Sequence, residues 1–125
     1  MRTILFVALA TTLTAGVALA QEPAKPGDSA KGKTLVDAKG MTLYTYDRDT
    51  AAGKSSCNVN CATNWPPLMA AAGAKDSGSW TVITRDDGGK QWAYKGKPLY
   101  FWKDDKKAGD AEGDNRNNVW HIAAP

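Results

Sequence analysis

The chain has little of the side-chain chemistry from which enzyme active sites are commonly built. It contains one histidine, His121, and two cysteines, Cys57 and Cys61, in 125 residues. Ser55 and Ser56 have no recognisable base or nucleophile elbow beside them in the sequence. No pair of acidic residues stands out as the acid and base of a glycosidase. We therefore expect a protein that is not an enzyme.

The same scarcity argues against a metal or haem site. One histidine without a second histidine or a cysteine near it is a poor metal site, although a lone copper or haem ligand stays open. Attachment of c-type haem needs C-x-x-C-H, and no histidine follows Cys61. Residues 110–115 alternate oxygen-bearing side chains, but Asn115 stands where an EF-hand loop has glycine. We expect no metal and no cofactor.

A long uncharged apolar run occurs at the N-terminus. Residues 4–20 are apolar or small, follow the positive charge of Arg2, and end in an A-x-A cleavage pattern. We interpret residues 1–20 as a cleaved signal peptide, because the run is short for an uncleaved membrane anchor. No cysteine lies at the cleavage point, so we expect a periplasmic or secreted protein with no membrane insertion after cleavage.

The charge is mixed rather than concentrated. The chain has 16 basic and 13 acidic residues and a formal net charge of +3. A nucleic-acid partner usually needs a concentrated basic face. The small basic cluster of Lys103, Lys106 and Lys107 is surrounded by aspartates at 104, 105 and 110, which is typical of a solvated turn. We expect no nucleic-acid partner.

One segment occurs twice. Residues 39–49 read KGMTLYTYDRD and residues 95–105 read KGKPLYFWKDD, and each copy is followed by a glycine, Gly53 or Gly109. Without any gap, the copies share Lys-Gly, Leu-Tyr, a second aromatic residue and an aspartate. We interpret this as an internal duplication. We predict that both copies form a strand followed by a turn, related by a pseudo-two-fold axis.

The hydrophobic pattern predicts short strands and no long helix. Alternating segments bounded by turn signals predict strands at residues 34–37, 41–47, 80–84, 91–94, 98–102 and 119–122. Residues 21–33 lack apolar periodicity and are predicted to be a flexible leader. We expect an all-β or mainly β single domain over residues 34–125. It is built from short antiparallel strands in two related repeats, at about 34–70 and 80–124.

The cysteines and the repeated aspartates are predicted to be structural. An exported chain favours a disulfide between Cys57 and Cys61, and their C-x-x-x-C spacing differs from the C-x-x-C of redox-active dithiols. Asp49 and Asp105 each precede a glycine by four residues. We predict that they cap one helical turn, each accepting a backbone N–H two or three residues on. The rival hypothesis makes them metal ligands or catalytic acids.

The aromatic residues, among them five tryptophans and four tyrosines, are the most unusual feature. Tyr44 and Tyr46 share one face of their strand, and Tyr100 and Trp102 share the equivalent face. Core packing is the favoured interpretation, since small β domains need large side chains to build a core. The alternative is an exposed row that binds a sugar, a polymer or a protein. The candidate ligand-binding residues are Trp65, Trp120 and His121.

The repeated Tyr-x-aromatic-x-x-Asp of residues 44–49 and 100–105 resembles a bacterial family. Its members are secreted repeats described as predicted lipoproteins with a Y-x-[FWY]-x-x-D motif. The CNVNCA of residues 57–62 and the WPPL of residues 65–68 are also similar to that family. The resemblance implies a secreted protein and leaves its activity open, because the family has no settled function. This chain departs from the family in lacking a lipobox cysteine.

Together these features predict a non-enzymatic binding or structural module of the cell envelope. Its partner is unknown, and another envelope protein or a polymer would fit. The alternative is a redox or metal-linked accessory protein that uses Cys57 and Cys61, or His121.

Overall fold

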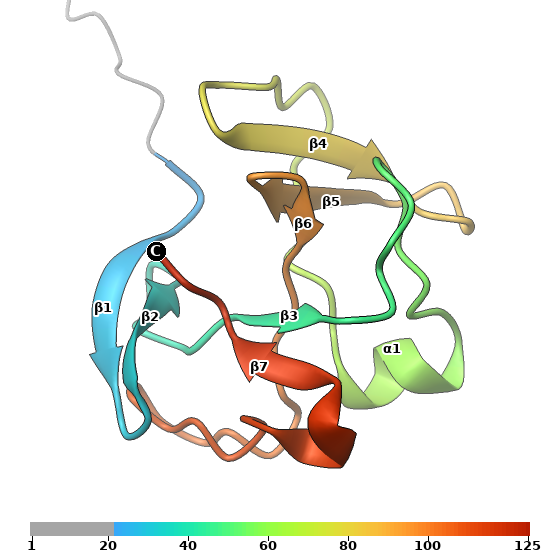
Figure 1. Cartoon of the computed structure of the whole chain (residues 1–125). Helices are drawn as coiled ribbons and strands as arrows, with labels where there is room; N and C mark the ends of the chain where they lie inside the picture. Colours follow the sequence, from blue (N-terminus) through green and yellow to red (C-terminus); the bar gives the residue numbers. More distant parts are fainter. Residues whose placement is uncertain (1–21) are drawn as a thin grey trace, which may run out of the picture.

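A computed structural model describes residues 22–125, and the predicted signal peptide lies outside the described residues. The elements follow in the order β1 (Lys25–Ser29), β2 (Gly32–Val36), β3 (Tyr44–Tyr46), α1 (Asn60–Asn64), β4 (Trp80–Thr84), β5 (Lys90–Tyr94), β6 (Lys97–Pro98), a 3-10 turn at Arg116–Asn118, and β7 (Trp120–Ile122). The strands form three small antiparallel groups, β1-β2, β3-β7 and β4-β5-β6 (Figure 1). The mainly β class predicted from the sequence is confirmed. No helix within residues 22–125 is long and apolar enough to cross a membrane.

The prediction of a flexible leader over residues 21–33 is wrong. Lys25–Ser29 forms β1 and pairs along its whole length with β2. Most of its side chains are exposed, so the strand shows no apolar alternation in the sequence. Main-chain hydrogen bonds stabilise it instead, and Gly27 lets it lie against Val36, where an added Cβ would come within 2.7 Å of a methyl group.

The two repeats meet at a pair of tyrosines. The N–H of Tyr44 donates to the carbonyl of Tyr100 at 2.8 Å, and the N–H of Tyr100 donates back at 3.0 Å. The copies share backbone geometry on either side of this pair, since Gly40 and Gly96 have φ of 80° and 83°. The corresponding contacts to the other repeat also match: Asp47 donates its N–H to Val119, and Lys103 donates its N–H to Asn64. These reciprocal contacts agree with the predicted pseudo-two-fold relation.

Two strand predictions were too long. The segment predicted at 41–47 is a regular strand only over Tyr44–Tyr46, with an isolated bridge at Thr42. The segment predicted at 98–102 overlaps β6 only at Pro98, the last residue of that strand, and contains an isolated bridging residue at Tyr100. After Leu99, which donates its N–H to Trp92, the chain leaves β5: Trp92 donates its own N–H to Leu68, and Tyr100 pairs with Tyr44. The short helix α1 lies between the segments predicted as strands at 41–47 and 80–84.

The paired central segments separate two cores. Leu43 and Leu99 point to one side and are fully buried in a largely aliphatic cluster that includes Leu35 and Leu68. The next residues along each strand face the opposite way and enter an aromatic cluster, because side chains alternate along a strand. The buried members of that cluster are Tyr44, Cys57, Trp65, Tyr100, Trp102 and Trp120. Burial on both faces explains why both sets of positions are apolar in the sequence.

Candidate functional site

The motif tyrosines bind the motif aspartates of the opposite repeat. The Tyr44 hydroxyl donates to Asp105 Oδ2 at 2.6 Å, and the Tyr100 hydroxyl donates to Asp49 Oδ2 at 2.5 Å. Both tyrosines are 0% exposed. The exchange therefore joins the two repeats through two phenol–carboxylate pairs, in which both phenols and Asp105 are buried and Asp49 is partly buried.

The other oxygen of each aspartate closes a loop within its own repeat. Asp49 Oδ1 accepts the N–H of Ser56 at 2.6 Å, and Asp105 Oδ1 accepts the N–H of Glu112 at 2.9 Å. Both donors lie seven residues beyond the carboxylate. The predicted cap with a donor two or three residues on is therefore wrong. The hydrogen bond of each aspartate closes a longer loop that extends past the glycine, rather than capping a single helical turn.

The pairs perturb the acid–base properties of the buried groups. Burial raises the pKa of the Tyr44 phenol, and its hydrogen bond to Asp105 raises the pKa further. Burial and the hydrogen bond to Asp49 likewise raise the pKa of Tyr100. Burial also raises the pKa of Asp49, against the opposing effect of the hydrogen bonds that it accepts. All three shifts favour the neutral form, as expected for groups removed from water.

We expect alkaline pH to destabilise the protein through these phenols. A phenol whose folded pKa lies above its unfolded value of about 10 gives stability that is complete below that pH and is lost as pH rises toward the folded value. The thermal midpoint of the wild type should thus fall above about pH 10, and less steeply in Tyr44→Phe and Tyr100→Phe. Calorimetry across pH measures this, with Tyr94→Phe as the matched control. The same slope in all four proteins would contradict the assignment.

The aromatic cluster is a stack of four rings that both repeats supply. Tyr46 lies parallel to Trp120, with ring centroids 4.1 Å apart, and Trp120 lies parallel to Trp65 at 3.8 Å. Trp102 tilts against Trp65 at 4.3 Å, and the Arg116 guanidinium lies over Trp102. The exposed fractions of the three tryptophans are 7% or less. These residues are therefore core, and the alternative of an exposed aromatic row is wrong.

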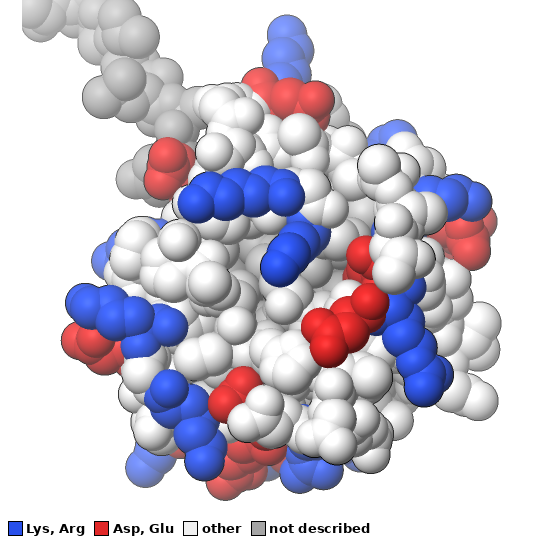
Figure 2. Space-filling model, in the orientation of Figure 1, with Lys and Arg blue, Asp and Glu red and all other residues white. Residues whose placement is uncertain are grey.

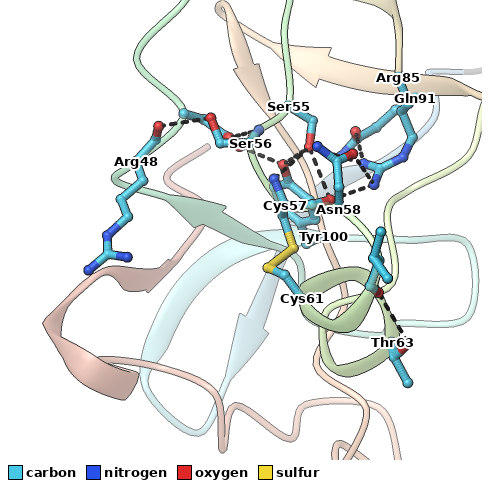
Figure 3. Close-up of a disulfide and its surroundings, with 12 residues drawn as sticks. Arg48, Ser55, Ser56, Cys57, Asn58, Cys61, Thr63, Arg85, Gln91 and Tyr100 are labelled. Atoms are coloured by element: carbon cyan, nitrogen blue, oxygen red, sulfur yellow. Dashed lines mark hydrogen bonds between the residues drawn. A yellow bond between two sulfur atoms is a disulfide. The ribbon is translucent and has the colours of Figure 1, made fainter. Parts of the chain in front are cut away.

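A buried arginine that the sequence analysis missed ties the second half to the cysteine loop. Arg85 is 4% exposed and donates to Ser55 Oγ at 3.1 Å, to Gln91 Oε1 at 2.7 Å and to the Cys57 carbonyl (Figure 3). Ser55 Oγ also lies 2.6 Å from the Tyr100 hydroxyl. The network thus runs from Arg85 to the Tyr100–Asp49 pair. Neither Arg85 nor Gln91 carries a signal in the sequence, because an arginine beside a turn is usually solvated.

The predicted disulfide is confirmed. Cys57 and Cys61 are bridged, with their Cα atoms 5.1 Å apart. Cys57 is fully buried against the aromatic cluster, whereas Cys61 lies in α1 and is partly exposed. The bridge therefore fixes α1 to the core, and Figure 3 shows it beside the Arg85 network.

The disulfide loop carries the most unusual backbone in the described chain. Val59 has φ 49° and ψ −109°, and its side chain is 82% exposed. A β-branched residue at positive φ is a genuine outlier. Val59 borders a cleft of about 520 Å³ between the disulfide loop and the turn after β4, which we name the Val59 cleft. Its lining residues are Asn58, Val59, Ala62, Thr63, Arg85, Asp86 and Asp87.

His121 lies half-buried at the surface, and its side-chain hydrogen bonds are with Asp47 and Asn115 rather than with the cysteine loop. Its Nε2 lies 2.8 Å from Asp47 Oδ2 and its Nδ1 lies 3.2 Å from Asn115 Oδ1. It lines a second hollow of about 300 Å³ with Lys95 and Lys97, among others. Within residues 22–125 no group of three or more histidine, cysteine or acidic residues is placed to bind a metal. The face in Figure 2 has charges of both signs scattered over it.

Comparison with known proteins identifies the family. The family model described as a secreted repeat of unknown function matches residues 25–69 and 81–124. The first match begins at β1, which the predicted repeat boundary of 34 left out. No curated protein and no solved structure matches the chain. The chain belongs to the family of secreted repeats of unknown function and carries two copies of that repeat.

Proposed function

We propose that this secreted protein is a non-enzymatic binding module and that the Val59 cleft is its contact site for a protein partner. The observation that carries the proposal is the backbone of Val59. A residue in a sparsely populated φ/ψ region costs on the order of 1–3 kcal/mol and persists only when its surroundings impose it. Here the strained residue exposes an apolar side chain that adds little to either core. Contact with a partner protein would explain why the apolar side chain of Val59 is exposed.

The surroundings of Val59 are rigid, which suits recognition. The disulfide fixes one side of the loop, and Arg85 fixes the Cys57 carbonyl. Asn58 donates to Asp86 Oδ2 at 3.0 Å, which joins the loop to the opposite wall of the cleft. A preformed site loses less conformational entropy when it binds.

The aspartates of the repeated motif are already engaged in hydrogen bonds within the fold. Asp49 and Asp105 are bound to tyrosines and to backbone N–H groups, so they stabilise the fold. This supports a structural role for the motif and a binding role for surfaces elsewhere, without a catalytic step.

The acidic rim indicates the partner's chemistry. Asp86 and Asp87 are exposed at the edge of the cleft, beside apolar Val59 and Ala62. Lys54 reaches Asp86 only at 3.9 Å, with both side chains largely exposed, and such a pair is weak. A partner segment with an apolar side chain flanked by a basic one would match this surface.

Site-specific photocrosslinking tests the proposal. A photoreactive phenylalanine analogue at position 59 is expected to crosslink a defined exported protein of the producing cell, identified by mass spectrometry. The same analogue at the exposed Ala72, in the loop between the repeats, is the matched control and should not. Unlabelled wild-type protein should compete for the product, whereas Val59→Asp should not. No product at position 59, or equal products at both positions, would overturn the proposal.

A further inference from the structure

We propose that the aromatic cluster is a one-electron relay that absorbs oxidising equivalents. A one-electron oxidant in the surrounding medium that contacts the half-buried Tyr46 end of the ring stack takes an electron from the tryptophans behind it, first from Trp120. The resulting hole passes along the stacked tryptophans and is trapped on Tyr44 or Tyr100 as a neutral tyrosyl radical, while the phenol proton moves to Asp105 or Asp49.

The four stacked rings provide the path along which the electron hole moves. Its three successive centroid distances, from Tyr46 through Trp120 and Trp65 to Trp102, are 4.1, 3.8 and 4.3 Å. The first two pairs are nearly parallel, with interplanar angles of 13° and 5°. Rings that overlap face to face at contact distance exchange electrons readily, since their π orbitals overlap. Tyr46 is half-buried, so the stack has an end that the medium can reach.

The two trapping tyrosines lie beside the centre of the stack. Tyr44 lies edge-on to Trp65 with centroids 5.3 Å apart, and Tyr100 lies edge-on to Trp120 at 5.2 Å. Each tyrosine is therefore one contact away from the parallel tryptophan pair. Both are fully buried, which shields a radical there from solvent.

The two carboxylates allow a tyrosine to hold the hole, because each can accept the proton that the oxidised phenol releases. When a phenol loses an electron its O–H becomes strongly acidic, and a buried cation without a base is costly. Asp105 and Asp49 accept the two phenol hydrogen bonds at 2.6 and 2.5 Å, so each proton has a short transfer path. The O–H bond of tyrosine breaks, an O–H bond forms on the carboxylate, and the electron fills the hole on tryptophan. The products are a neutral tyrosyl radical and a neutral carboxylic acid.

Packing alone gives a weaker account of these pairs. Asp105 is buried and Asp49 is partly buried, so both carboxylates lose water on folding, and a buried charged group is often no more stabilising than apolar residues of similar volume. The chain nonetheless has the same phenol–carboxylate arrangement twice, each time next to a stacked tryptophan. A relay requires that combination of ring contact and proton acceptor.

Flash photolysis with a photo-oxidised ruthenium complex as the oxidant tests the relay. In the wild type the transient absorption of the tryptophan radical should decay as that of the neutral tyrosyl radical appears. The double variant Asp49→Asn/Asp105→Asn keeps one accepting oxygen at each position, but an amide does not take up the proton. We expect it to lose most of the tyrosyl signal and to retain the tryptophan radical. Asp47→Asn, which alters a carboxylate bound to His121 instead, is the matched control and should behave as the wild type.

A second variant keeps the test decisive if the double asparagine protein does not fold. Tyr44→Phe/Tyr100→Phe retains the ring contacts and both acids, and it should show a long-lived tryptophan radical with little tyrosyl signal. Circular dichroism establishes that each protein measured is folded. An undiminished tyrosyl signal in either folded double variant would overturn the relay. So would its loss in Tyr94→Phe, because Tyr94 lies outside the stack.

Discussion

Replacing Asp105 with alanine is expected to lower the free energy of unfolding by about 3 kcal/mol, because two donors lose their acceptor at a buried position. The Tyr44 hydroxyl is fully buried, and the N–H of Glu112 closes the loop onto the same carboxylate. Asn at this position should cost less, on the order of 1 kcal/mol, since it keeps one accepting oxygen but places an amide NH2 where the second acceptor stood.

Denaturant unfolding of the two variants at neutral pH measures these costs. Asp104→Ala removes the neighbouring carboxylate and is the matched control, for which we expect a change within about 0.5 kcal/mol. A double-mutant cycle with Tyr44→Phe should give a coupling energy, since the hydroxyl and the carboxylate are in direct contact. Additive effects of the two substitutions would contradict the structural importance of the pair.

Replacing Trp120 with alanine is expected to have the largest effect on stability, about 4 kcal/mol, because truncating a buried tryptophan leaves a large cavity. Trp120 is 3% exposed and contacts the rings of Tyr46, Trp65 and Tyr100. Trp120 belongs to the second repeat, whereas Tyr46 and Trp65 belong to the first, so its loss should weaken the packing of one repeat on the other.

The measurement is the free energy of unfolding together with the near-ultraviolet circular dichroism of the stacked rings. Trp92→Ala is the matched control, because Trp92 is only partly buried at the edge of the aliphatic cluster. We expect that control to be less destabilised and to retain the signal of the four-ring stack. An equal loss of unfolding free energy in the two variants would show that the four-ring stack stabilises the fold no more than a partly buried tryptophan does.

Several features of the fold could be read from local sequence. The strand β4 was predicted with its observed bounds, since the alternating WTVIT of residues 80–84 ends before the turn signal DDGG. The bridge between Cys57 and Cys61 followed from an exported chain with a single cysteine pair. The duplication was visible because its copies align without a gap, and shared glycines impose shared backbone geometry.

Other features depended on residues far apart in the chain. The strand β1 is polar and exposed, so its pairing with β2 leaves no trace in hydrophobic periodicity. The burial of Arg85 depends on acceptors 28 and 30 residues earlier, at Cys57 and Ser55. No spacing rule within one segment can locate such partners.

The sequence by itself determined that this protein is a mainly β pair of repeats with a repeated tyrosine and aspartate. Only the tertiary structure decided which aspartate each tyrosine binds. The bonds join residues 61 and 51 positions apart and exchange partners between the repeats. The reason is geometric: the two tyrosines pair through their backbones near the pseudo-two-fold axis, and from there each side chain reaches the loop of the opposite repeat. A motif fixes which groups are present, whereas packing of one repeat against the other fixes which groups meet.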